Sequence, residues 1–221
     1  MTQRRKAVTA RRRRQGPARP TRERVLAAAF TTFRDRGFSR ASTLEIATRA
    51  KVSKRELYTL FEDKQAMLVA CIVARAERMR APLRLPTPEN RDELKAILTA
   101  IGTALISGTC DPDVLAVYRL AIAESETAPT IARTLDTAGR QTNRGAVVKM
   151  FVEAQARGIL NAGDAAAMAE VFFGALWNDL LVRLLLRVAE APTAKDAKRR
   201  AQAAAELFLG VHASAGGKIE T

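Results

Sequence analysis

The sequence predicts an all-α protein with an N-terminal three-helix head, containing a helix-turn-helix, and a larger C-terminal helical domain. Hydrophobic residues make up 48% of the 221 residues and aromatic residues only 5%, and alternation of β-branched residues is scarce. Apolar residues recur instead at the spacing of one helix face, and prolines and glycines separate these runs. We expect four parts: an arm over 1–20, the head over 21–68, the helical domain over 69–214 and a flexible tail over 215–221.

The first helix is expected to begin at Thr21 and to end at Gly37, because glycine readily takes a positive φ after a helix. Its core face is expected to consist of Val25, Leu26, Ala29, Phe30 and Phe33. Phe38 would then pack back onto the same core.

Residues 42–64 predict two short helices, over 43–50 and from Ser53 to about residue 60, with Lys51 and Val52 forming the turn between them. The residues expected to face the core of the head are Leu44, Ile46, Ala47, Val52, Leu57 and Phe61. A core built from so few residues depends on each of them.

Both helices of this pair carry a start signal. Ser42 with Glu45, and Ser53 with Glu56, have the spacing of a capping box. Two capped helices joined by a tight turn, in a chain of net charge +14, favour a device that places its second helix in the DNA major groove.

Asp63 is expected to cap a fourth helix that reaches about Arg80, and three prolines at 82, 86 and 88 would end it. Further helices are expected over about 89–107, 112–125, 128–157, 164–189 and 194–213.

The helix expected over 164–189 is the most apolar. Asp179 interrupts its apolar run, which is therefore far shorter than a membrane span requires. One face of this helix could pack in the core of its own domain, and another face could pack against a second copy of the protein. This helix and the last helix would then form a four-helix interface with the same two helices of the second copy, across a two-fold axis. Asn178 and Asp179 would lie in the middle of this helix. Their polar side chains could bind a ligand or form hydrogen bonds across the dimer interface.

Positive charge is concentrated at the N-terminal end. Residues 1–20 hold eight basic and no acidic side chains. Residues 21–68 hold ten basic and six acidic side chains, and residues 69–221 hold nineteen basic and seventeen acidic ones. The arm, with Arg11, Arg12, Arg13 and Arg14, is expected to grip phosphates or to enter a minor groove, although a solvated tail has the same composition. The arm lacks the apolar segment of a secretory signal, and Cys71 and Cys110 form no disulfide pattern, which favours a reducing cytoplasm.

The order of motifs is a basic arm, a helix, Gly37–Phe38 and then the pattern IA-x-x-A-x-VSK-x-x-LY-x-x-F-x-x-K. Over residues 21–70 it resembles the TetR/AcrR family of bacterial transcriptional regulators, and RLAIAESETAPTIARTL at 119–135 is similar to the effector-domain sequence of one subgroup. The resemblance implies a homodimer that represses promoters and releases DNA when a small molecule enters the C-terminal domain.

The resemblance also implies the DNA contacts. Ser42, Thr43, Tyr58 and Lys64 are expected to contact phosphates. Lys54 and Arg55, at the start of the recognition helix, and Thr59, one turn further on, are expected to read base edges.

Three positions depart from the family pattern. Lys51 stands where many members have glycine, and Leu60 replaces a common histidine. Glu56 places an acid in the recognition helix, where it could read a cytosine amine or complete the Ser53 capping box, and the spacing favours the cap.

Two further sites are expected in the C-terminal domain. An apolar effector pocket is predicted from Met67, Cys71, Leu105, Tyr118, Met150, Phe151 and Trp177. A dimer interface is predicted from Phe172, Gly174, Leu181, Leu207 and Val211. A ligand on the Met67–Cys71 face of the fourth helix would shift that helix and change the spacing of the two heads.

No catalytic cluster, metal site or cofactor is predicted. His212 is the only histidine, and the two cysteines have none nearby, so neither an enzyme nor a zinc site is expected. With the helix-turn-helix, the family resemblance implies a homodimeric repressor that binds a pseudo-palindromic double-stranded operator, has no membrane partner and is released by a small, largely apolar effector. The alternative is a sequence-neutral nucleic-acid-binding or architectural protein driven by its arm, and an activator would share the same motifs.

Overall fold

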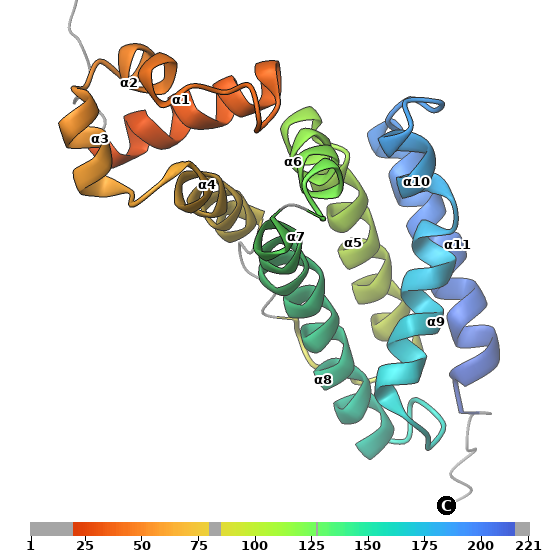
Figure 1. Ribbon diagram of the computed structural model, residues 1–221. Helices are drawn as coiled ribbons and strands as arrows, with labels where there is room; N and C mark the ends of the chain where they lie inside the picture. The colour runs from red at the N-terminus through yellow and green to blue at the C-terminus, as the bar shows by residue number, and fades with distance from the viewer. Residues whose placement is uncertain (1–19, 80–84, 127, 215–221) are drawn as a thin grey trace, which may run out of the picture.

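The computed structural model describes residues 20–79, 85–126 and 128–214 (Figure 1). The arm with Arg11–Arg14 and the tail over 215–221 lie outside the described residues. The helices are α1 (Thr21–Arg36), α2 (Thr43–Ala50), α3 (Lys54–Leu60), α4 (Lys64–Met79), α5 (Arg91–Thr109), α6 (Pro112–Ala123), α7 (Pro129–Leu135), the π-helix η1 (Asp136–Gln141), α8 (Thr142–Ala156), α9 (Ala165–Trp177), α10 (Leu180–Leu185) and α11 (Ala194–His212). Within the described residues the only extended pairing is an isolated bridge between Leu160 and Ala213, which confirms the all-α prediction.

The head forms as expected from its local signals, with one difference in capping. Gly37 ends α1 with φ 75°. The Ser53 capping box is complete: Ser53 Oγ accepts from the Glu56 amide at 3.1 Å, and Glu56 Oε2 accepts from the Ser53 amide at 2.7 Å. Ser42, in contrast, caps α2 through the Leu44 amide while Glu45 pairs with Arg49, so no box forms there.

One predicted core residue of the head was wrong. Leu44 is 64% exposed, whereas Ile46, Ala47, Leu57 and Phe61 are buried and Val52 is half-buried. The helical spacing explains the exposure of Leu44, because at about 3.6 residues per turn it is rotated by roughly 110° from the centre of the face formed by Ile46, Ala47 and Ala50.

Two apolar clusters organise the molecule. The first joins the head to α4, and it continues into α6 and α7 through Val117, Leu120 and Ile131. The second fills the space among α5, α8, α9 and α11, with Phe151, Phe172 and Phe208 at its centre. The boundary predicted at 68/69 falls inside α4, and the head cluster runs across it. The head therefore packs directly on α6 and α7 (Figure 1).

The long helix predicted over 164–189 is broken in the structure. Asn178 takes φ 44° and ψ −122°, and it separates α9 from α10, so its predicted mid-helix position was wrong. Two arginines bond the carbonyls at these helix ends. Arg200 donates to the carbonyls of Leu176 and Trp177 at 2.6 and 2.7 Å, and Arg119 donates to the Leu184 and Leu185 carbonyls at 2.7 and 3.0 Å.

The segment predicted as one helix over 128–157 is a continuous helical run, α7, η1 and α8, in which the π-helix was not foreseen. Among the described residues, no single helix is long and apolar enough to cross a membrane. Only α5 and α6 together meet that length and hydropathy test, as a pair bent by 70°.

The backbone of the turn in the helix-turn-helix is strained at Lys51, and a substitution can measure that strain. Lys51 lies in the left-handed region at φ 56° and ψ 50°, which costs a residue with a Cβ about 1 kcal/mol. Lys51→Gly is therefore expected to raise the free energy of unfolding by roughly 0.5–1 kcal/mol in urea melts. Lys51→Ala, which removes the charge but keeps the Cβ, is the control and should change stability little. Equal gains from both variants would assign the effect to charge.

Candidate nucleic-acid interface

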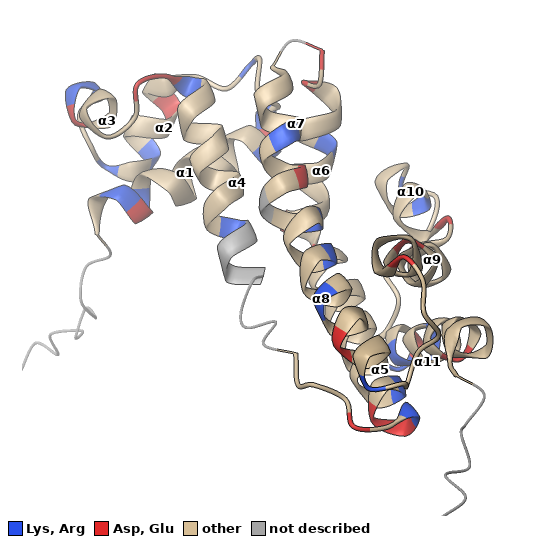
Figure 2. Cartoon of the chain, turned by 90° about the horizontal axis from the view of Figure 1, so that it is seen from below, with Lys and Arg blue, Asp and Glu red and all other residues tan. Residues whose placement is uncertain are grey.

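The recognition helix α3 is anchored on one side and open on the other. Leu57 and the following Phe61 are buried, and the helix repeat places Arg55 and Thr59 on the opposite, exposed face. Lys54 and Tyr58 lie on one flank of that face, and the basic start of the helix is visible in Figure 2. Thr59 Oγ1 donates to the Arg55 carbonyl at 2.9 Å, so its hydroxyl is satisfied within α3. The exposed face thus carries an arginine fork beside a small apolar group.

The start of α2 lies beside this flank of α3. Thr43 Oγ1 and the Tyr58 hydroxyl are 3.3 Å apart, so two residues expected at phosphates form one hydroxyl cluster. Lys54 Nζ is 5.8 Å from the centroid of the Tyr58 ring, which adds a cation to the cluster. Hydroxyl groups and free amide groups at a helix start, next to a lysine, form an arrangement suited to a phosphate oxygen.

Lys64 occupies a different environment from the one expected of a phosphate ligand. Its ammonium donates to the carbonyls of Ser39 and Ala41, at 3.3 Å each, and lies 4.6 Å from the centroid of the Phe38 ring. In this structure Lys64 therefore ties the loop between α1 and α2 to the start of α4, and it fixes the segment that leads into Ser42.

Glu56 and Arg40 complete the local electrostatics. The Ser53 amide is the main cause of a lowered pKa of Glu56, so the carboxylate acts as the cap that the spacing favoured. Arg40 is exposed in the loop just before Ser42. Sequence reasoning did not single it out, although a basic residue two positions before a predicted helix cap was a usable signal.

The predicted effector residues do not form one group. Met67 and Cys71 are buried in the head cluster, where the Cys71 thiol donates to the Leu26 carbonyl and burial raises its pKa to about 12. Both belong to the cluster that joins the head to α6 and α7 and not to the one that fills the C-terminal domain, so their assignment to a pocket shared with the other predicted residues was wrong. Helix periodicity predicted correctly which face of the fourth helix is buried, but it could not predict which other helices pack against that face.

The other five predicted effector residues belong to the C-terminal domain. Met150 and Phe151 are buried in the second cluster, Leu105 and Trp177 pack against it, and Tyr118 is half-buried, with a pKa raised by that burial. An open groove of about 710 Å³ lies elsewhere, between α5 and α11. Its lining consists of Asp92, Lys95, Ala96, Thr99, Ala100, Thr103, Ala104, Lys198 and Gln202, and it includes none of the predicted residues.

The predicted dimer residues divide by exposure. Phe172 is fully buried against Phe173 and Phe208, so its place in the interface was wrong. Leu207 and Val211 on α11 are 60% and 61% exposed, Gly174 is exposed and Leu181 is half-buried. Further exposed apolar side chains on α9 and α10 are Val171 and Val182. These residues give neighbouring helices an apolar surface without a partner in the monomer.

Within the described residues, no group of three or more His, Cys, Asp or Glu side chains is placed to hold a metal ion. His212 packs its ring 4.9 Å from that of Phe208, and its buried Nε2 has no hydrogen-bond partner there.

Two family models match the chain. One describes bacterial regulatory proteins of the tetR family and matches residues 25–71. The other describes the C-terminal domain of AefR-like transcriptional repressors and matches residues 96–213, more than half of the chain. The HTH-type transcriptional regulator UidR of Escherichia coli strain K12 is 39% identical over 72 residues, 33% of this chain, and the match spans only 37% of UidR.

Solved structures are similar over nearly the whole chain. A TetR transcriptional regulator from Agrobacterium tumefaciens has a TM-score of 0.77 at 26% identity, with 89% of this chain and 96% of that chain covered. The flavonoid-responsive regulator FrrA has a TM-score of 0.74 at 25% identity, with 89% and 98% covered.

Proposed function

Because the chain belongs to the TetR family of bacterial transcriptional regulators, we propose that it is a homodimeric repressor released from its operator by a small, largely apolar effector. The observation that carries the proposal is the exposed face of α3, with Arg55 and Thr59, set beside the Thr43–Tyr58 cluster. Such a face offers base readers and phosphate contacts on one surface.

Each side chain of this interface has a distinct role. Arg55 is the base reader, since its guanidinium suits the two acceptors on the major-groove edge of guanine, and the Thr59 methyl group suits a thymine methyl. Ser42, Thr43 and Tyr58 contact phosphates and set the register of α3, with Lys54 beside them. Lys64 acts indirectly, because its ammonium holds the loop before Ser42. The arm with Arg11–Arg14 adds affinity for any sequence.

The exposed apolar surface of α9, α10 and α11 supports a two-fold dimer. In that arrangement the two α3 helices would enter successive major grooves about 34–36 Å apart and read a pseudo-palindromic site. The operator places the protein on bacterial DNA, and hence in the cytoplasm at the nucleoid.

A single charge tests the dimer surface. Leu207→Glu is expected to give a monomer in sedimentation experiments, because it would bury an unpaired carboxylate in an apolar interface. Gln202→Glu, on the flank of α11 toward α5, is the matched control and should stay dimeric. A dimeric Leu207→Glu protein would remove this surface from the interface.

The effector is proposed to enter the C-terminal domain near Leu105 and Trp177, which are half-buried against the second cluster that contains Met150 and Phe151, and near the half-buried Tyr118 on α6. FrrA is a flavonoid-responsive regulator, which supports a small-molecule response in a protein of this architecture. Any effector acts only through a difference in its affinity for the free and the DNA-bound states.

Competition binding tests the function against the architectural alternative. Fragments recovered from genomic DNA with the full chain should share a sequence, and the specific complex should survive a large excess of random duplex. Compounds are then screened for release of the recovered DNA. Equal competition by random duplex at moderate salt would favour an architectural protein.

A further inference from the structure

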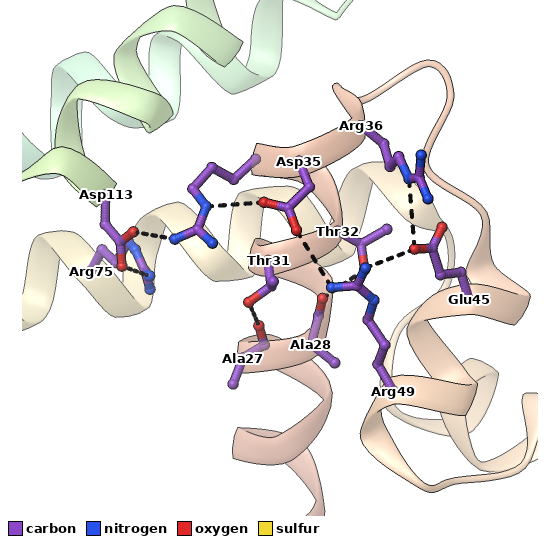
Figure 3. Close-up of polar contacts among 11 residues, drawn as sticks. Ala27, Ala28, Thr31, Thr32, Asp35, Arg36, Glu45, Arg49, Arg75 and Asp113 are labelled. Atoms are coloured by element: carbon purple, nitrogen blue, oxygen red, sulfur yellow. Dashed lines mark hydrogen bonds and ion pairs between the residues drawn. The ribbon is translucent and has the colours of Figure 1, made fainter.

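One carboxylate joins the start of α6 to two helices of the head. Asp113 Oδ1 is 2.9 Å from Arg34 Nη1 on α1, and Asp113 Oδ2 is 2.7 Å from Arg75 Nη2 on α4 (Figure 3). The Asp111 side chain accepts from the Asp113 amide at 2.8 Å, which fixes the first turn of α6. A carboxylate in that turn is also favoured by the helix dipole.

Ion pairs continue from this carboxylate into the helix-turn-helix. Arg34 Nε is 3.2 Å from Asp35 Oδ1, Asp35 Oδ2 is 3.5 Å from Arg49 Nη1, and Arg49 Nη2 is 3.0 Å from Glu45 Oε1 (Figure 3). The chain of charges thus runs from α6 along the end of α1 to α2. Glu45 lies two residues from Thr43, at the start of α2 that is expected to contact phosphate.

Apolar contacts and ion pairs have different effects at this junction. Val117, Leu120 and Ile131 bury apolar surface against the head cluster, but hydrophobic attraction has no preferred direction. A carboxylate between two guanidinium groups has a defined geometry, so it can fix an orientation. The Arg75 guanidinium also lies 3.3 Å from the centroid of the Phe30 ring, which holds that partner in place.

Asp113 is the critical residue among these ion pairs, because it is the carboxylate that both Arg34 and Arg75 share. Arg34 has a second acid in Asp35, whereas Asp113 is the only acid with which Arg75 forms an ion pair in the described part of the chain. Without the Asp113 carboxylate, Arg75 would lose this partner, and only Asp35 and solvent would screen the repulsion between the two guanidinium groups. The junction of α1, α4 and α6 would then lose its preferred geometry while its apolar contacts persist.

We propose that Asp113 is a positioning residue that sets the orientation of the DNA-binding head on the effector domain, and thereby the spacing at which two heads meet DNA. Further along α6, Arg119 donates to the carbonyls that end α10, so α6 connects the head to the proposed dimer surface. The inference rests on the proposed function, because spacing has meaning only for a dimer on a two-part site.

The test is a series of operators whose two half-sites are separated by one base pair more or less at each step. The wild-type protein should bind one spacing best. Asp113→Asn should weaken binding at that spacing by about two- to fivefold, the range expected for ion pairs of this exposure, and should flatten the profile. Affinity for a single half-site should stay unchanged, because no base-reading or phosphate-contacting residue is altered. A merely stabilising role would leave the shape of the spacing profile unchanged.

Two further variants keep the result decisive. Arg34→Met breaks the Asp113 link to α1, together with the Arg34–Asp35 pair, but keeps the Arg75–Asp113 pair. It should flatten the profile in the same direction but less, so it carries the test if Asp113→Asn fails to fold by circular dichroism. Glu206→Gln breaks the Lys95–Glu206 pair between α5 and α11, 2.8 Å in length and remote from the head, and should keep the wild-type profile. Wild-type profiles in the folded Asp113 and Arg34 variants would overturn the proposal and leave the function intact. A wild-type protein indifferent to spacing would instead overturn the two-headed function, and this inference with it.

Discussion

Replacing Arg55 with alanine is expected to weaken binding to the preferred site by about 1–3 kcal/mol and to relax discrimination at one base pair of each half-site. Arg55 lies on the exposed face of α3, opposite the buried Leu57, so its removal should leave the helix in place. The loss should be largest where the site carries guanine, because the arginine fork pairs with two acceptors of that base. Fluorescence anisotropy on a panel of single-base operator variants measures both effects.

The control for Arg55→Ala is Arg133→Ala, which removes the same charge from an exposed position on α7. It should reduce affinity for all sequences slightly, or not at all, and leave discrimination unchanged. If Arg55→Ala weakened binding to every operator variant equally, Arg55 would be a phosphate contact and not a base reader.

Replacing Phe208 with alanine is expected to lower the free energy of unfolding by about 3–5 kcal/mol. The Phe208 ring is fully buried and stacked on Phe151 with centroids 4.6 Å apart, and its centroid lies 6.1 Å from that of Phe172 in an edge-to-face arrangement. Its loss leaves a cavity where α8, α9 and α11 converge, and the helix backbones cannot close it without moving. Urea melts followed by circular dichroism measure the change.

Gln202→Ala, six residues earlier on an exposed face of the same helix, is the matched control and should change stability by less than about 0.5 kcal/mol. A loss below about 1 kcal/mol for Phe208→Ala would mean that this aromatic cluster is not the centre of the core.

Local signals predicted the head well because its structure is set locally. The Ser53–Glu56 box and the positive φ of Gly37 are decided within a few residues, so the bounds of α1, α2 and α3 followed from the sequence. The sequence placed Lys51 in the turn, and the family resemblance marked it as a common glycine position; the structure adds its left-handed conformation.

Other features depend on partners that are distant in the sequence. Arg200 donates to a carbonyl at the end of α9, where the helix breaks, and Arg119 donates to a carbonyl at the end of α10. Neither hydrogen bond can be predicted from the apolar pattern of residues 164–189. Periodicity likewise marked Met67 and Phe172 as apolar. It could not tell the head core from a pocket, or a domain core from a dimer surface.

The most direct test of the two-headed dimer compares the operator with a copy in which one half-site is randomised, both bound by the full chain at the same salt concentration. Two α3 helices reading successive major grooves predict a loss of at least about tenfold, since half of the base contacts disappear. Footprinting should show protection of both half-sites on the intact operator. Equal affinity for the two duplexes, with no symmetric footprint, would contradict the claim that this chain reads DNA as a two-headed dimer.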